Sequence, residues 1–209
     1  MKKILILITS IFLSLFFVSC NIDLQLSLKK DGSVDILFKG GAGKAFSKMI
    51  LSATGESGDV SGASLYDTKE IGYELAKAGF SNVKVNAGKT GTDLVITMAD
   101  LKQTSYLFSS GIVREEKGEL KANITPKSLK DFYTSADEQT QMILDLFLAP
   151  VFNDEQMSVS EYLEMLGTIY GAEAAREVED SVINVSLTAV DGSKTQKKIS
   201  FGALMCGVE

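Results

Sequence analysis

The stretch Asn21 to Phe38, NIDLQLSLKKDGSVDILF, has the pattern of two strands joined by a tight turn. Apolar and polar residues alternate on both sides of Asp31-Gly32-Ser33, and a period of two is typical of half-buried strands. Asp-Gly-Ser is a turn signal because Gly accepts a positive φ and the Asp side chain bonds to nearby backbone. We therefore predict a β-hairpin with one apolar face, made of Ile22, Leu24, Leu26, Leu28, Val34, Ile36 and Phe38.

The same tripeptide, Asp191-Gly192-Ser193, lies near the other end of the chain. It separates the strand-like segments 182–190 and 196–201, so a second hairpin is predicted there. Two further strands are predicted at 82–86 and 93–98. Segment 117–124 is predicted as another strand, or as half of a hairpin with Ile112-Val113.

Helices are predicted between the two hairpins. Their segments are 44–53, 67–78, 126–133 and 158–179, with a further start at Ser135 and Glu138. Asp67 and Ser158 each precede an acid by three residues, the pattern of an N-cap followed by a capping acid. The last helix should bury Val159, Tyr162, Leu163, Leu166 and Ile169. We expect an α+β fold: one antiparallel sheet contains both hairpins, and helices pack on one face.

Residues 142–152, MILDLFLAPVF, are apolar on nearly every side up to Pro150. A helix that is apolar all round is either buried in the core or presents its outer face to a partner or to lipid. Both interpretations remain open. In the second, the contact surface for an apolar ligand or partner consists of Met142, Ile143, Leu146, Phe147, Val151 and Phe152.

The composition excludes several functional classes. The chain has no histidine, which excludes the usual Ser-His-Asp and Cys-His hydrolases. With only two cysteines, common zinc sites are excluded as well. The 27 acidic residues outnumber the 21 basic ones, which argues against nucleic-acid binding. We expect no metal, no cofactor and no enzymatic activity. A hydrolase that uses paired carboxylates alone is the remaining enzymatic alternative.

Two glycine-lysine segments fail as phosphate loops. A P-loop needs Gly, four residues of any kind, and then Gly-Lys followed by Ser or Thr. Before Gly43-Lys44 the first glycine is replaced by Phe38, and Ala45 stands where the hydroxyl is needed. Before Gly88-Lys89-Thr90 the first glycine is replaced by Val83. Both segments are therefore interpreted as loops, with residues 40–43 as a flexible break and 54–63 as another loop.

The N-terminus has the pattern of an export signal. Met1-Lys2-Lys3 is basic, and residues 4–18 carry no charge. This apolar run is shorter than the roughly 20 residues that span a bilayer. It ends in Phe17-Val18-Ser19-Cys20, which resembles the lipobox of bacterial lipoproteins. Phe17 replaces the usual leucine, as in the relaxed lipoboxes of spirochaetes.

The lipobox resemblance implies that the Cys20 thiol receives a diacylglycerol and that a peptidase cuts between Ser19 and Cys20. Residues 1–19 are then a signal peptide, and residues 20–209 form one α+β domain. Two or three acyl chains on Cys20 suffice for stable anchoring. The protein would be a membrane-anchored lipoprotein of the bacterial cell envelope, on the periplasmic or cell-surface side. The alternative is an ordinary secretory signal, with Cys20 free or bonded to Cys206.

A cysteine followed at once by strand, Asp-Gly-Ser turn and strand, here Cys20 and residues 22–38, resembles the start of LppM-type bacterial lipoproteins. That family implies an α+β domain at the envelope with lipid contacts. It implies no particular site residue. Our first hypothesis is a non-enzymatic envelope lipoprotein that binds a partner protein or an apolar ligand. The alternative is a lipid-handling lipoprotein that uses residues 142–152.

Overall fold

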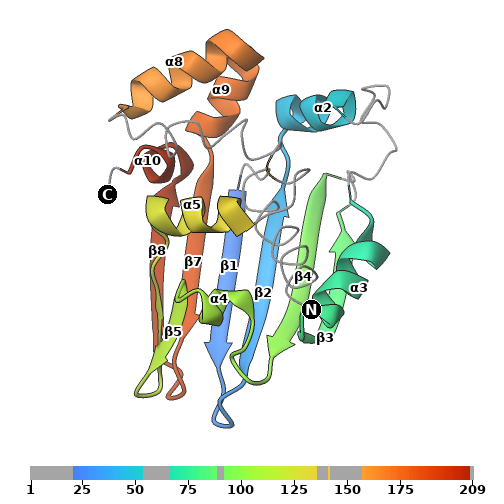
Figure 1. Cartoon of the computed structure of the whole chain (residues 1–209), viewed down its shortest axis with the longest axis vertical. Coiled ribbons are helices and arrows are strands. Elements are labelled where there is room, and N and C mark those ends of the chain that lie inside the picture. Colours follow the sequence, from blue (N-terminus) through green and yellow to red (C-terminus); the bar gives the residue numbers. More distant parts are fainter. Residues whose placement is uncertain (1–20, 54–65, 89–91, 136–140, 142–156, 208–209) are drawn as a thin grey trace.

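The computed structural model describes residues 21–53, 66–88, 92–135, 141 and 157–207 (Figure 1). Several predictions lie outside these ranges: the signal peptide with Ser19 and Cys20, the loop 54–63, and the apolar segment 142–152. They stay predictions. Of the helix start predicted at Ser135 and Glu138, Ser135 is the last residue of the helix Pro126–Ser135, and Glu138 lies outside the described ranges.

The described strands form a six-stranded sheet in the order β3-β4-β2-β1-β7-β8, and a separate two-stranded sheet β5-β6. The large sheet consists of β1 (Asn21–Leu28), β2 (Val34–Gly41), β3 (Ser81–Ala87), β4 (Asp93–Asp100), β7 (Val182–Thr188) and β8 (Lys194–Ser200). The small sheet consists of β5 (Val113–Glu116) and β6 (Glu119–Ala122). The α+β fold class is confirmed, and both Asp-Gly-Ser hairpins lie in one sheet (Figure 1).

The prediction of a purely antiparallel sheet is wrong at one ladder. β1 pairs with β7 in parallel, from Asn21 opposite Val182 to Ser27 opposite Thr188. The two hairpins meet through their first strands, which start from the same end of the sheet. A parallel pair needs a long connection. Here that connection is the whole chain between residues 28 and 182, which includes several helices.

The register follows from the alternating sequence. β1 pairs with β2 from Asp23 opposite Lys39 to Leu28 opposite Val34, which brings apolar residues to one face. That face holds the core, with Ile22, Leu26 and Phe38 fully buried. A shift of one residue would expose the whole apolar set, so burial fixes this register.

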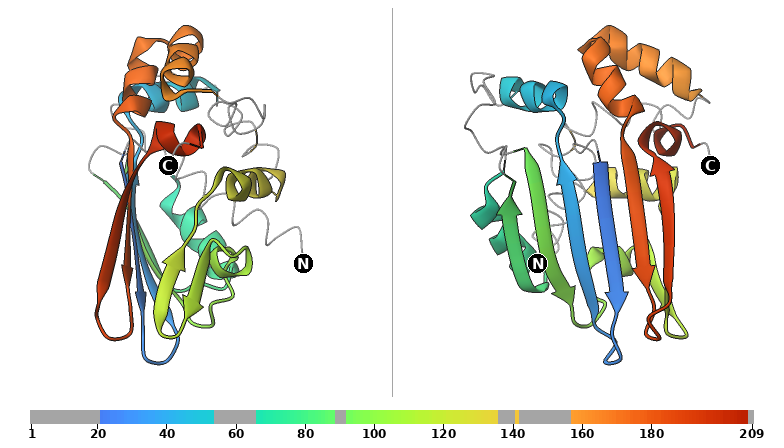
Figure 2. Two further views of the ribbon diagram at one scale, coloured as in Figure 1. Left: turned by 90° about the vertical axis from the view of Figure 1, so that its left-hand side faces the viewer. Right: turned by 180° about the vertical axis from the view of Figure 1, so that it is seen from behind.

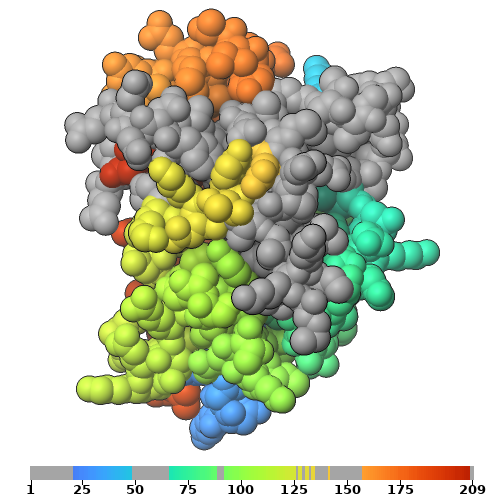
Figure 3. Space-filling view, in the orientation of Figure 1, coloured from blue at the N-terminus to red at the C-terminus, as the bar shows by residue number. Residues whose placement is uncertain are grey.

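The helices lie on the core face of the sheet or at one end of it (Figure 2). They are α2 (Lys44–Ala53), α3 (Thr68–Lys77), α4 (Tyr106–Ser109), α5 (Pro126–Ser135), α8 (Val159–Tyr170), α9 (Ala172–Glu179) and α10 (Phe201–Met205). In the space-filling view, α5, α4 and the β5-β6 hairpin stand in front of the sheet (Figure 3). Tyr162 of α8 and Leu75 of α3 are among the side chains that complete the core.

Several boundaries differ from the predictions. Gly40 and Gly41 continue β2 instead of forming a break, because they pair with Leu94 and Asp93. The helix predicted over 158–179 is interrupted at Gly171, whose φ of 92° turns the chain between α8 and α9. Ile169, predicted as buried, is 59% exposed near this break. β7 ends at Thr188.

The C-terminal strand also ends earlier than predicted. β8 stops at Ser200, and Phe201 begins the short helix α10. Phe201 is buried there, together with Leu204 and Met205. The chain therefore leaves the sheet at Ser200 to close one end of the core.

Candidate functional site

The face of the sheet opposite the core is bare of helices in the described part of the chain (Figure 2, left). We call it the open face. Its middle row, from β3 to β8, contains Lys84, Thr97, Leu37, Gln25, Ser186 and Gln196. The row nearer α2 contains Asn86, Val95, Lys39, Asp23, Asn184 and Lys198. The row nearer the hairpin turns contains Ala99, Asp35, Ser27, Thr188 and Lys194.

Polar side chains on the open face bond across the strands. The Nε2 of Gln196 donates to the Oγ of Ser186 at 3.1 Å. One row away, the Nδ2 of Asn184 donates to the Oδ1 of Asp23 at 3.0 Å. These bonds hold side chains from β1, β7 and β8 in fixed positions, as cross-strand pairs do in stable sheets. The open face is therefore an ordered polar surface at this side of the sheet.

The open face is hollowed on the side of β3. The hollow has a volume of about 470 Å³ and is lined mainly by Gln25, Ser27, Asp35, Leu37, Lys84 and Thr97. Asn82 also lines it, from a break in register between Ser81 and Lys84 where its φ is 56°. A bulge bends its strand and increases the local twist, so β3 forms one wall of the hollow.

Charge on the open face is mainly positive. Its lysines are Lys39, Lys84, Lys194 and Lys198, and its aspartates are Asp23, Asp35 and Asp93. Asp35 is 2.8 Å from the Nζ of Lys29, a residue of the β1-β2 turn. The bond to Asp35 raises the pKa of Lys29. The surface is thus locally basic on a chain whose net charge is −6.

A second hollow lies on the other side of the sheet, beside the edge strand β8. It has a volume of about 190 Å³ and lies between β7-β8 and the segment that follows β6. We call it the edge pocket. Its apolar lining is Ala122, Ile124, Val185, Leu187 and Ile199, and its polar lining is Asn123, Thr195 and Lys197.

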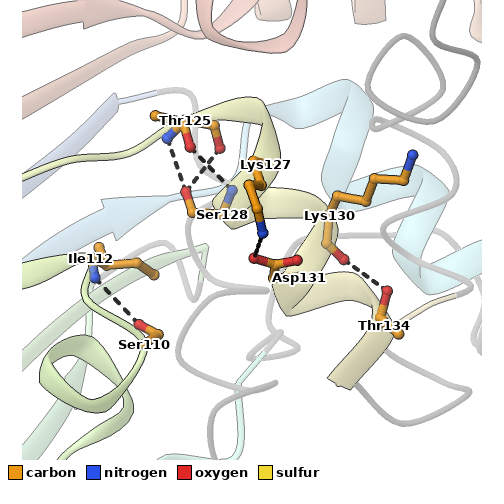
Figure 4. A network of polar contacts seen from close by, with 8 residues as sticks. All are labelled: Ser110, Ile112, Thr125, Lys127, Ser128, Lys130, Asp131 and Thr134. Carbon is orange, nitrogen blue, oxygen red and sulfur yellow. Dashed lines mark hydrogen bonds and ion pairs between the residues drawn. The ribbon is translucent and has the colours of Figure 1, made fainter.

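The start of α5 fixes one wall of the edge pocket (Figure 4). The N–H of Ser128 donates to the Oγ1 of Thr125 at 3.2 Å, and the N–H of Thr125 donates to the Oγ of Ser128 at 2.9 Å. This reciprocal pair satisfies backbone donors at the helix start, as a capping box does. Ile124, directly before it, is thereby held against β7 and β8.

Acidic side chains serve structure at several positions. Glu177 of α9 accepts from the N–H of Ala45 at 2.8 Å and from that of Phe46 at 3.2 Å. It occupies the N-terminus of α2, where a phosphate loop would bind its anion. Asp100, which is buried, accepts from the N–H of Thr104 and that of Ser105. The segment with Gly43-Lys44 is therefore a β2-α2 junction closed by a carboxylate of the same chain.

Cys206 is a free, half-buried thiol at the end of α10. Burial raises its pKa, which disfavours the reactive thiolate. Burial also raises the pKa of Tyr162, with a smaller contribution from Cys206. Within the described ranges, no three His, Cys, Asp or Glu side chains gather where they could hold a metal ion. None of the helices in those ranges has the length and apolar character needed to cross a bilayer.

The site residues predicted from sequence and the surfaces found in the structure do not coincide. Ser19, Cys20 and residues 142–152 are not among the described residues. The open face and the edge pocket were missed. The open face had a signal in the sequence, since Asp23, Gln25 and Ser27 alternate with the core residues of β1. No sequence pattern indicates the edge pocket, because its lining combines the end of β6 with strands about sixty residues later in the chain.

Comparison with known proteins adds no relative. No protein-family model, no curated protein and no solved structure matches this chain.

Proposed function

We propose that this protein is a non-enzymatic, membrane-anchored lipoprotein of the bacterial cell envelope that binds a partner protein through the open face. The observation that carries this proposal is the open face itself: an ordered, polar sheet surface that no described helix covers. The other face of the same sheet is packed with apolar side chains. One side of the sheet thus builds the domain, and the other remains available for a partner.

The chemistry of the open face favours an acidic protein surface. Lys39, Lys84, Lys194 and Lys198 outnumber the three aspartates, and complementary charge steers association and selects partners. The rows of the open face given above contain no aromatic side chain, so they offer no platform for stacking sugar rings or bases. Amides and hydroxyls such as Gln25 and Thr97 supply hydrogen bonds of the kind found in protein interfaces.

The proposed anchor would orient the open face. Cys20 directly precedes Asn21, the first residue of the central strand β1. Lipid on Cys20 would hold the end of the sheet that carries α2, α8 and α9 beside the membrane (Figure 1). β1 has 8 residues, a length of about 26 Å at roughly 3.3 Å per residue. The open face would then stand upright on the membrane and meet a partner from the side.

The carboxylates support a non-enzymatic role. A carboxylate-only hydrolase needs two acids facing each other across the substrate. Asp35 is the acid that lines the hollow of the open face, and it is paired with Lys29. Other acids cap helices or close turns, as Glu177 and Asp100 do. Asp35 is thus engaged in an ion pair, and Glu177 and Asp100 accept hydrogen bonds from the backbone.

Crosslinking in intact cells tests the binding surface. A photo-reactive amino acid replaces Leu37 at the centre of the open face, and in a control it replaces Tyr73, which is 63% exposed on α3. We expect a defined adduct with an acidic protein from position 37. The double variant Lys39→Glu, Lys84→Glu should reduce its yield at least about tenfold, the effect of roughly 1.4 kcal/mol in binding.

The matched control reverses two lysines away from the open face, Lys69→Glu and Lys102→Glu. It should leave the adduct unchanged. Equal adducts from positions 37 and 73, or equal losses in the two double variants, would show that the open face is not the binding surface.

Metabolic labelling with a fatty acid tests the anchor separately. The wild-type chain should carry label and remain with membranes, and Cys20→Ser should lose both properties because the acceptor thiol is gone. Label retained by Cys20→Ser would refute the lipid anchor and leave the binding surface untouched.

A further inference from the structure

We propose that β8 is an acceptor edge: an extended segment of a partner protein adds to it as a seventh strand, with acidic residues on one side and apolar residues on the other. This inference goes beyond the proposed function, because it concerns the edge of the sheet and the edge pocket. It holds whether or not a partner also covers the open face.

The backbone of β8 is paired on one side in the described part of the chain. β7 faces it from Thr188 opposite Lys194 to Val182 opposite Ser200. Beyond both ends of this ladder, the N–H of Ala189 donates to the carbonyl of Ser193, and the N–H of Phe201 donates to that of Ser181. Bonded pairs alternate in an antiparallel ladder. Thr195, Lys197 and Ile199 therefore bond toward β7.

The remaining residues of β8 direct their backbone groups outward. By the same alternation, these are Lys194, Gln196, Lys198 and Ser200. Residues 194–198 are all exposed, and the left view of Figure 2 looks directly onto this strand. Their N–H and carbonyl groups form a regular row that is spaced to bond another extended chain.

The two edges of the sheet differ in a way that favours β8. β3 has a register break after Ser81, and Asn82 takes a φ of 56° there, which disrupts the row of backbone groups. Bulges are one means by which proteins block edge pairing. β8 has no bulge and no proline in its 7 residues. β8 therefore lacks two of the features that would prevent strand addition.

Charge determines which strand fits. An added strand would lie about 4.8 Å from β8, and its residues on the open-face side would stand beside Lys194, Gln196 and Lys198. Opposite charges directly across a strand pair stabilise it, and like charges destabilise it. The partner segment is therefore acidic on that side.

A second copy of this chain is a poor occupant for the same reason. Antiparallel pairing of two β8 strands centred on Gln196 sets Lys194 of each copy opposite Lys198 of the other. Centring the pair on Lys197 sets that lysine opposite itself. The lysines thus act against self-association while they attract an acidic strand.

The edge pocket determines the other side of the partner segment. Residues of an added strand that stand beside Thr195, Lys197 and Ile199 project on the core side, next to the pocket. Its volume is about 190 Å³, which is room for a branched apolar side chain. The stem of Lys197 can cover that side chain while its ammonium stays in water. The segment therefore alternates acidic and apolar residues.

A synthetic peptide tests the proposal on the full-length protein in detergent micelles. The probe is a fluorescent heptapeptide that alternates glutamate with valine or leucine, and the control peptide has the same composition with the apolar residues grouped together. Fluorescence anisotropy should show saturable binding of the alternating peptide and at least about tenfold weaker binding of the control. Absence of saturable binding would overturn the proposal.

Two substitutions at one position isolate the backbone contribution. Gln196→Pro removes an outward N–H and no bond to β7, and proline is tolerated at such edge positions. Gln196→Ala removes the same side chain and keeps the N–H. We expect at least about tenfold weaker peptide binding for proline and near wild-type binding for alanine. Equal binding by the two variants would refute strand addition.

Hydrogen exchange gives a test that does not depend on a variant. On peptide binding, the amides of Gln196 and Lys198 should exchange at least about tenfold more slowly. Unchanged exchange at both amides during saturable binding would place the peptide elsewhere and refute the inference.

A Gln196→Cys variant that crosslinks to a second copy at native concentration would overturn the inference in favour of self-pairing. Loss of peptide binding by Gln196→Pro with the adduct at position 37 intact would separate the acceptor edge from the open face.

Discussion

The two Asp-Gly-Ser hairpins have the same turn and different places in the sheet. In the first, the N–H of Ser33 donates to Asp31 at 3.0 Å, and in the second, the N–H of Ser193 donates to Asp191 at 2.8 Å. The glycines have φ values of 82° at Gly32 and 87° at Gly192. Yet β1 and β2 are central strands, whereas β8 is an edge.

The strands explain the difference. β1 and β2 each place an unbroken apolar row on the core face, from Ile22 to Leu28 and from Val34 to Phe38. β8 contributes one residue, Ile199, that packs against the core. A strand with a full apolar row buries more of it when it lies between two other strands. A polar strand has little apolar surface to bury, so an edge position costs it little stability. The turn therefore specifies the hairpin, and the strand sequence specifies its position.

The largest expected difference between the hairpins is in core truncation. Leu26→Ala in β1 should lower the free energy of unfolding by about 2–5 kcal/mol, because Leu26 is fully buried between neighbouring strands. Ile199→Ala in β8 should cost about 1 kcal/mol, since its side chain is only partly buried. Urea denaturation measures both. Lys194→Ala, at an exposed position of β8, is the control and should lie within about 0.5 kcal/mol of wild type. Similar losses at residues 26 and 199 would contradict the division into central and edge strands.

A smaller effect should be the same in both hairpins. Gly32→Ala and Gly192→Ala force a side chain into the left-handed region, at a cost of about 1–2 kcal/mol each. A Cβ at either glycine meets no atom within 4 Å, so only backbone strain contributes. Thermal or urea unfolding should give two losses that agree within about 0.5 kcal/mol. A clearly larger loss at Gly32 would show that its central position also constrains the turn.

The smallest expected effect is on the stability of the fold at low pH. Hydrogen bonds from the side chain and backbone of Ser33 lower the pKa of Asp31, and those of Ser193 lower the pKa of Asp191, both from 3.8. A lowered folded-state pKa stabilises the fold above the unfolded value, and this contribution disappears as pH falls through the folded pKa. Nuclear magnetic resonance titration should find both pKa values below 3.8. Asp31→Asn and Asp191→Asn should each flatten the loss of stability below that pH. A folded pKa above 3.8 at either residue would contradict the turn geometry.

Local features of the fold could be predicted from the sequence because they depend on neighbouring residues. Alternation located β1 and β4, and Asp67 located the start of α3, where it accepts from the N–H of Lys69 and of Glu70. The capping box at Ser158 was also found where predicted. Each of these is decided within about one turn of helix or one strand.

Features that depend on distant segments could not be predicted. The parallel ladder between β1 and β7 depends on which hairpin edges meet, and no local pattern encodes that choice. The break at Gly171 could not be predicted, because glycine inside a helical pattern is often tolerated. It depends on the packing of α9 back toward α8, which no local pattern indicates. The polar residues of β1 indicated a polar face of the sheet. Alternation alone cannot show that no described helix covers that face.

The ladder between β1 and β7 has a consequence for how the chain is made. Asp23 bonds to Asn184, a residue 161 positions later, so the central strand waits for nearly the whole chain to emerge. Until then, β1 and β2 form a hairpin whose apolar face has few partners, and such surfaces aggregate. Contacts of this sequence separation also slow folding. A chain that emerges N-terminus first therefore exposes the apolar face of its first hairpin until β7 arrives.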